Sequence, residues 1–171
     1  MSSIQTSGTQ EDAQMAVFQY VRSLMPNDVP VILAQENDVD IPKPPFVIIN
    51  PGRTIRLATN SRDYSVDGQV TLEQAAQVDM QVDTYGQGGA DRMGILTTLW
   101  RDEHACDWFR QNFPDMAPLY AEQRQQVQFI NEAQDYEERW TADLAMQVNQ
   151  RITLPLESAI YPGPVIIEDI K

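Results

Sequence analysis

The stretch VTLEQAAQVDMQVDTY, residues 70–85, alternates between apolar and polar side chains. Every second residue from Val70 onward is mostly apolar, and the residues between them are mostly polar. A period of two predicts an extended strand that buries one side and leaves the other in water. Residues 140–154 follow the same pattern, with Leu144 and Met146 on the apolar side. Two long strands of this kind are typical of an antiparallel sheet with one packed face.

A helix is predicted over residues 10–25, ahead of the two long strands. Thr9 and Asp12 have the spacing of a capping box, in which each side chain bonds to the backbone of the other. Apolar residues then recur at helical spacing, and Pro26 ends the helix. We expect the apolar stripe of this helix to pack on the apolar face of the long strands.

A second helical stretch follows the glycine-rich segment GQGG, residues 86–89, with Asp91 as its expected N-cap. The segment lacks the spacing of a phosphate-binding loop, so we interpret it as a connection. A bend is expected near residues 103–104, and Pro114 ends the helical stretch. The side chains expected to face the core are Ile95, Leu96, Leu99, Trp100, Cys106, Phe109 and Phe113.

Short β-branched runs predict further strands at residues 31–33 and 46–49. Asn50-Pro51-Gly52 predicts a turn or bulge, after which the strand resumes at residues 54–59. A last apolar piece, residues 165–170, is expected to add to a sheet edge in its own subunit or in a neighbour. The segments expected to be loops, turns or loose chain are residues 1–8, 35–45, 60–68, 114–128 and 131–138.

This order of elements predicts an α+β fold, an antiparallel twisted sheet with helices packed on one face. A chain of 171 residues suits a single domain, residues 1–171. Within it we expect a flexible N-terminus at residues 1–9, an α+β core at residues 10–162 and a C-terminal tail at residues 163–171.

The chain carries 25 acidic and 12 basic residues, a net charge of -13, and one cysteine. The charge argues against tight, non-specific DNA binding, which needs clustered Lys and Arg. The sequence contains neither a secretory signal nor an apolar run of about 18 residues that would span a membrane. We therefore expect synthesis in the cytoplasm. The simplest reading of the charge is solubility.

No catalytic or metal-binding constellation is evident. His104 and Cys106 point in different directions on a helix, and Asp38 and Asp40 lie in a segment without the glycine and glutamate of a calcium loop. The adjacent carboxylates at residues 102–103 and 137–138 motivate only a distant alternative, a carboxylate-dependent hydrolase. We expect no enzyme activity, no cofactor and no metal.

Four segments resemble the neck or tail-terminator proteins of contractile-tailed bacteriophages. They are FVIINPGRTIRLATNSRDY (46–64), VDTYG (82–86), TLWRDEHACDWF (98–109) and FINEAQDYEERWTADLAMQVNQRITLP (129–155). The resemblance runs from about residue 12 to residue 160. It implies a tail-terminator fold similar to that of tail-tube proteins, and it supplies no active site to transfer.

The resemblance also implies a structural role in the virion neck. Such subunits form a ring, commonly a hexamer, that caps the tail tube and sheath and docks head-completion or connector proteins. Genomic DNA would pass through the ring without specific binding, and no membrane is involved. A head–tail connector or a tube-related completion protein remains the alternative reading.

Seven charged residues are candidates for lining the channel or meeting a neighbouring subunit. Three of the seven are arginines, which make up a quarter of the basic residues. They form either a basic patch, which would pair with an acidic neighbouring subunit or contact a phosphate, or merely a solvated strand face. The candidates are Asp79, Asp83, Glu137, Glu138, Arg53, Arg56 and Arg62.

Overall fold

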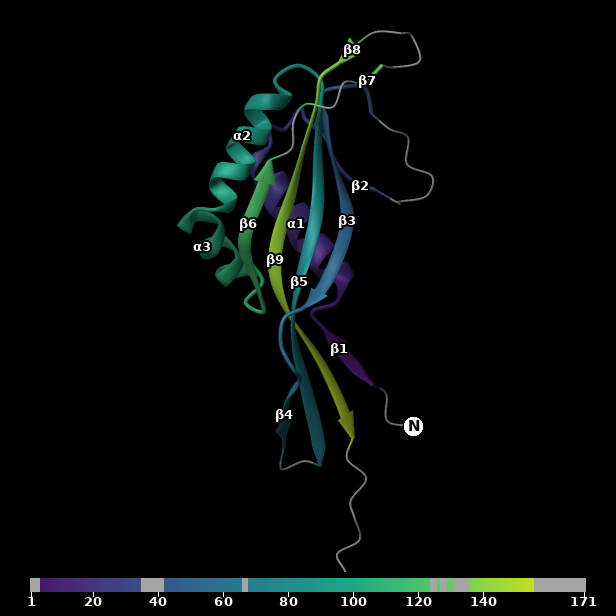
Figure 1. The fold of residues 1–171 in the computed structure, drawn as a ribbon, viewed down its shortest axis with the longest axis vertical. Coiled ribbons are helices and arrows are strands. Elements are labelled where there is room, and N and C mark those ends of the chain that lie inside the picture. The colour runs from purple at the N-terminus through teal and green to yellow at the C-terminus, as the bar shows by residue number, and fades with distance from the viewer. Residues whose placement is uncertain are drawn as a thin grey trace, which may run out of the picture.

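Two 17-residue strands, β5 (Gln69–Tyr85) and β9 (Arg139–Pro155), form the spine of the molecule (Figure 1). They pair antiparallel over their whole length, from Gln69 opposite Pro155 to Tyr85 opposite Arg139. Both strands predicted from the alternation are therefore confirmed. The computed structural model describes residues 4–34, 42–65, 68–123, 126, 129–130 and 136–155.

Shorter strands extend the sheet on both sides of this spine. β3 and β4 pair with β5, whereas β1 and β6 pair with β9. β2 pairs parallel with β3, so the sheet is mixed and the purely antiparallel prediction is wrong at this edge. These strands are β1 (Gln5–Ser7), β2 (Val31–Leu33), β3 (Phe46–Arg56), β4 (Ser61–Tyr64) and β6 (Met116–Gln123), and a separate hairpin is made by β7 (Phe129–Ile130) and β8 (Tyr136–Glu137).

Strands β1, β4 and β6 lie in segments that the sequence predicted to be loops or loose chain. Each lies along one of the long strands and pairs with it on one side only in the described part of the chain. Such a strand takes its conformation from its partner's backbone groups and needs no apolar alternation of its own. Pro118, which lies at a register shift in β6, is an example of a residue with low strand propensity that such a strand accommodates.

The bulge predicted in β3 is confirmed. The register against β5 shifts between Pro51 and Thr54. A Cβ atom on Gly52 would lie 2.6 Å from the carbonyl oxygen of Asp79, so the backbones approach too closely there for any larger residue. The bulge brings Arg53 over the sheet next to Asp79.

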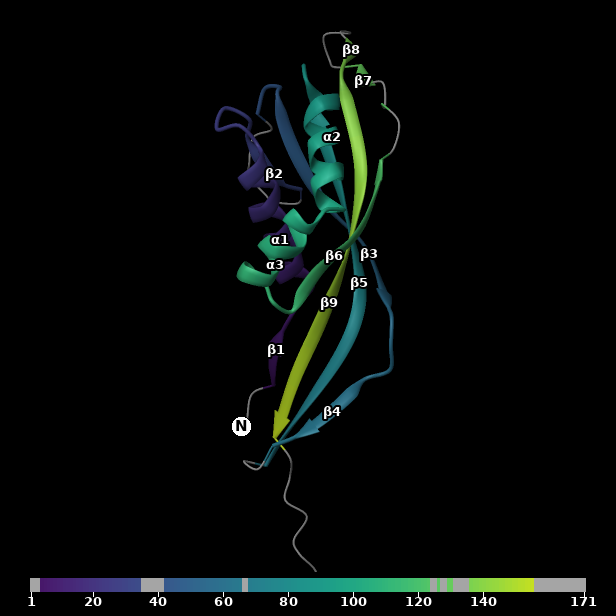
Figure 2. The ribbon, with the colours of Figure 1, turned by 90° about the vertical axis from the view of Figure 1, so that its left-hand side faces the viewer.

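Three helices, α1 (Gln10–Leu24), α2 (Gly89–Trp100) and α3 (Glu103–Asn112), lie on one side of the long strands (Figure 2). α1 begins with the predicted capping box, in which the Thr9 backbone N–H donates to Asp12 Oδ2 at 2.8 Å and the Asp12 N–H donates to Thr9 Oγ1 at 3.1 Å. The helical stretch is interrupted between the end of α2 at Trp100 and the start of α3 at Glu103, next to the predicted bend.

Three predictions for α2 and α3 are wrong. The N-cap of α2 is Gly88, in the left-handed region with φ 78°, and Asp91 lies in the first turn. Ile95 is exposed and Met93 is buried in its place. Cys106 is exposed, because the break before α3 rotates the later apolar stripe so that Ala105 and Phe109 face the core.

The core lies between the helices and the apolar face of β5 and β9. Met80 from β5 and Leu144 from β9 are fully buried, and Val17 and Val21 of α1 pack in the same cluster. This placement confirms the predicted docking of α1 on that face. Burying a side chain of this size stabilises the fold by about 2 kcal/mol.

The lower part of the spine projects beyond the helices as an arm (Figure 1). We define the arm as residues 4–8, 54–65, 68–75 and 149–155. It contains β1, β4 and the paired lower halves of β9 and β5. Most side chains of β5 and β9 in this part are half-buried or exposed, in contrast to the buried upper half. The predicted strand at residues 165–170, the tail at 163–171 and most of the loop at 35–45 lie outside the described residues.

An aromatic cluster joins the three helices. The Tyr20 ring of α1 lies 5.5 Å from Trp100, 5.2 Å from Trp108 and 5.6 Å from Phe109, measured between ring centroids. The Tyr20 hydroxyl is 3.2 Å from Nδ1 of His104. Burial raises the pKa of Tyr20 to about 12, with smaller contributions from the charges of Asp102 and Cys106.

We predict that the free energy of unfolding decreases as the pH rises from about 10 to about 12. The raised pKa means that the fold favours neutral Tyr20, so this contribution is complete below the unfolded pKa of about 10 and is lost as the pH approaches the folded value. Denaturant unfolding across this range should show a smaller decrease in Tyr20→Phe. Tyr64→Phe, a change at an exposed ring, is the matched control. An unchanged pH dependence in Tyr20→Phe would contradict this account.

Candidate assembly surface

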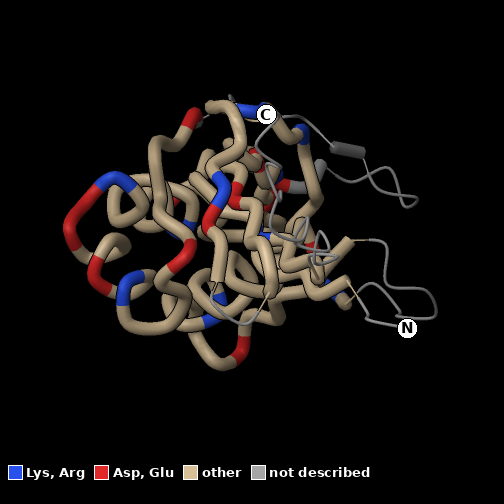
Figure 3. The backbone as a smooth tube through the Cα atoms, turned by 90° about the horizontal axis from the view of Figure 1, so that it is seen from below, with Lys and Arg blue, Asp and Glu red and all other residues tan. Residues whose placement is uncertain are grey.

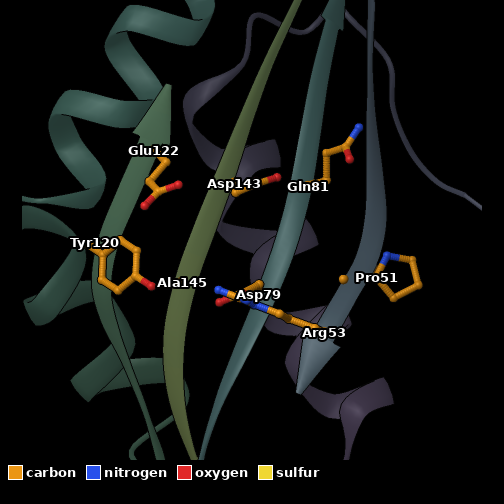
Figure 4. Close-up of a pocket in the computed structure, with 9 residues that line it drawn as sticks. Pro51, Arg53, Asp79, Gln81, Tyr120, Glu122, Asp143 and Ala145 are labelled. Atoms are coloured by element: carbon orange, nitrogen blue, oxygen red, sulfur yellow. The ribbon is translucent and has the colours of Figure 1, made fainter. Parts of the chain in front are cut away.

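The face of the sheet that points away from the helices carries a polar hollow of about 330 Å³ (Figure 4). β5 and β9 supply its floor, the bulge of β3 forms one wall, and β6 forms the opposite wall. Glu122 on β6 and Asp143 on β9 are opposite one another in register. The lining residues are Pro51, Gly52, Arg53, Asp79, Gln81, Tyr120, Glu122, Asp143 and Ala145.

The centre of the hollow is an ion pair between Arg53 and Asp79. Arg53 Nε lies 2.6 Å from Asp79 Oδ2, and this hydrogen bond raises the pKa of Arg53. The Arg53 side chain is 69% exposed, whereas that of Asp79 is 14% exposed. Gln77 Nε2 donates to Asp79 Oδ1 at 2.7 Å and to the Tyr120 hydroxyl at 2.8 Å. Asp79 is thus held in place while Arg53 remains accessible to a partner.

Asp83, predicted on the wet side of the strand, is only 1% exposed. Its carboxylate accepts hydrogen bonds from Asn50 Nδ2 at 3.1 Å, from Gln81 Nε2 at 3.0 Å and from the Thr141 hydroxyl. Arg139 Nη2 forms an ion pair with it at 3.2 Å. The expectation of an exposed row therefore fails at Asp83, because long polar side chains from three strands cover it.

Glu138 caps helix α2. Its Oε1 accepts from the backbone N–H of Ala90 at 3.2 Å and from Trp140 Nε1 at 2.9 Å. A carboxylate at this position satisfies a free N–H group and interacts favourably with the helix dipole. The glycine-rich loop therefore presents a helix end that already holds an anion. Glu137 lies in β8, and its side chain is outside the described residues.

The remaining predicted arginines lie on the arm. Arg56 Nε donates to the Ala58 carbonyl at 2.8 Å, and its Nη2 donates to Asn60 Oδ1 at 2.7 Å. Arg62 is exposed in β4. The seven candidates therefore do not form one site. Viewed from below, acidic and basic positions are interspersed (Figure 3).

The described residues contain no group of three or more His, Cys, Asp or Glu that could hold a metal ion. Asp102, one of the paired carboxylates, is the N-cap of α3 and accepts from the His104 backbone N–H at 3.0 Å. In the same part of the chain no helix is long and apolar enough to cross a membrane.

Residues 14–170 match the family model described as phage neck terminator protein. The chain belongs to the phage neck terminator family. Among curated proteins, none matches it. Membership confirms the resemblance inferred from the sequence and assigns the chain a structural role in the phage neck, in association with other phage tail or head proteins. Its place is the neck of the virion.

The buried network at Asp83 yields a stability prediction. Asp83→Ala removes the carboxylate that pairs with Arg139 and leaves several donors without an acceptor, so it should lower the free energy of unfolding by about 3 kcal/mol. Asp79→Ala breaks an ion pair with a solvent-exposed arginine and should lower it by less than about 1 kcal/mol. Chemical denaturation of both variants measures the difference. Equal losses would show that the Asp83 network does not carry this stability.

Proposed function

We propose that the chain is a tail terminator whose copies form a ring, commonly a hexamer, on the end of the tail tube. The ring stops growth of the tube and sheath and joins the tail to head-completion or connector proteins. The observation that carries this proposal is the family match over residues 14–170. Its role is structural rather than catalytic, and residues 1–171 act as one domain.

Charge supports the passage of DNA through such a ring. With a net charge of -13, the chain lacks the excess of cations that would hold phosphates by counterion release. Asp79, Glu137 and Glu138 remain the acidic candidates near the channel or a neighbour. Asp83 is a weaker candidate, because its carboxylate is already enclosed by its own subunit.

Ring formation requires two different surfaces on each copy that meet head to tail and close by rotation. The projecting arm offers two such surfaces, because its outer strands β1 and β4 lie on opposite sides of the paired long strands (Figure 1). The polar outer face of the sheet is a further surface open to a partner (Figure 4). The exposed guanidinium of Arg53 suits an acidic group of a neighbouring subunit.

Electron microscopy of the purified protein mixed with isolated tail tubes tests the proposal. We expect six-fold rings seated on tube ends and tubes that no longer elongate when tube protein is added. A twelve-fold ring under the portal would instead favour the head–tail connector reading. A protein that forms no ring and binds no tube end, alone or with tubes, would contradict both readings.

A further inference from the structure

Among the described residues, the arm carries most of the exposed large apolar side chains. Four of the seven belong to it, and the most exposed of these are Ile4 at 64% and Tyr64 at 59%. Ile4 directly precedes β1 and Tyr64 ends β4, so an exposed apolar side chain lies at each outer strand of the arm. The four are Ile4, Ile55, Leu57 and Tyr64.

The arm also has two open sheet edges. Its strand order is β1-β9-β5-β4, so β1 and β4 each have one side without a strand partner in the described part of the chain. The Ser65 N–H donates to the Gln69 carbonyl at 2.9 Å, so the backbone groups of Ser65 point toward β5. Along β4 the backbone groups of successive residues point alternately toward β5 and away from it. The backbone N–H and C=O groups of Arg62 and Tyr64 therefore point to the open edge. An open edge of this kind pairs readily with another chain.

The directions of the strands allow these two edges to meet in neighbouring copies. β1 is antiparallel to β9, β9 to β5, and β5 to β4. If one copy follows another head to tail in the same sheet, β1 of the second copy therefore runs antiparallel to β4 of the first. Antiparallel pairing is slightly more stable per residue than parallel pairing.

Each edge has an exposed charge near it that can pair with the other. The β4 edge carries Arg62 and, on the opposite face of the strand, Asp63, both of which are exposed. The β1 edge leads into the acidic first turn of α1, which contains Glu11 and Asp12. Asp12 is occupied by the capping box, whereas Glu11 is exposed in the first turn of α1, shortly after the end of β1. Arg62 and Glu11 have opposite charges, which favours a joint that brings a β4 edge to a β1 edge.

We propose that the β4 edge of one copy adds to the β1 edge of the next copy, as an antiparallel strand pair that makes the arms one continuous sheet. This inference rests on the proposed ring and names the surface that builds it. Backbone hydrogen bonds supply the register, and Ile4 of one copy and Tyr64 of the other are buried at the joint. Arg62 meets Glu11 across it.

Disulfide cross-linking between different copies tests the pairing. In a Cys106→Ser background, chains with Arg62→Cys are mixed with chains that carry Gln5→Cys, Thr6→Cys or Ser7→Cys, allowed to assemble, and oxidised. Opposite residues of paired strands place their Cβ atoms about 4.5–5.5 Å apart, so a small local shift brings them within the range of a disulfide. We expect a covalent dimer of the two chains with at least one of the three positions. The control partner is Thr98→Cys, an exposed position on α2, which should give only background.

A charge exchange tests the same joint without cysteine. Arg62→Glu and Glu11→Arg should each raise the protein concentration needed for assembly by about tenfold, because each places like charges across the joint. The double variant, which reverses the pair, should restore assembly. Both changes are at exposed positions, so all three variants should stay folded. The melting temperature of the free chain should fall by only a few degrees where Glu11→Arg places a cation in the first turn of α1, and should hardly change in Arg62→Glu.

The outcomes separate this inference from the proposed function. If rings form on tube ends but no β1 position cross-links to Arg62→Cys above the Thr98→Cys background, the strand pairing is wrong and the terminator role stands. Failure of the double variant to recover assembly would likewise overturn the assigned contact. If the unsubstituted protein forms no ring and binds no tube end, the proposed function fails and this inference fails with it.

Discussion

The fold depends on the continuous pairing of β5 with β9. No bulge interrupts the 17 residue pairs, so the alternation of both strands stays in register from end to end. One face of this ladder is therefore apolar over its upper half and the other is polar. Each long strand also offers its second edge to shorter strands, β3 and β4 on β5, and β6 and β1 on β9. A one-residue slip would exchange the two faces and expose the core, which makes this register strongly specified.

The same ladder has a different environment in its two halves. The upper half is covered by the helices and holds Met80, Leu144 and Met146 fully buried. The lower half projects as the arm, where the sheet has neither helices nor, in the described residues, further strands beyond β1 and β4. One long element is thus anchored in the core of its own subunit, and its far end carries the edges that we propose pair with a neighbouring copy. A rigid two-stranded support positions an assembly surface better than a loop would.

The charged groups on the face of the sheet that points away from the helices have two roles: some stabilise the sheet, and others are accessible to a partner. The Asp83 carboxylate is enclosed by donors from Asn50, Gln81, Thr141 and Arg139, so it serves the internal order of the sheet. Arg53 stands at the surface of the hollow, placed there by the bulge at Gly52. An accessible cation, Arg53, therefore lies on this face together with the exposed Glu122, on a chain that is strongly acidic overall.

Sequence patterns predicted the helix and the two long strands, because these elements depend on residues close together in the chain. The capping box at Thr9 and Asp12 and the alternation of residues 70–85 and 140–154 correspond to α1, β5 and β9. The polar strand β1 was missed because its only support is pairing with β9, more than 140 residues later. The family was suggested by the pattern of several segments.

The candidate surface was less predictable. The exposure of Asp83 depends on which long side chains from neighbouring strands cover it, and the cap role of Glu138 depends on where β9 meets α2. The open edges of β1 and β4 follow from the strand order, which the sequence does not encode in any local pattern. The hairpin connection predicted at residues 60–68 in fact contains β4, one of the two strands with an open edge.

Hydrogen exchange of the free chain tests the central claim most directly, that the β5–β9 ladder holds the fold together. Amides that exchange only by global unfolding report the most stable unit of a protein. We predict that the slowest amides lie in residues 78–84 and 141–148, with faster exchange in residues 69–75 and 149–155 and in the helices. Helix amides that outlast those of both long strands would contradict the account.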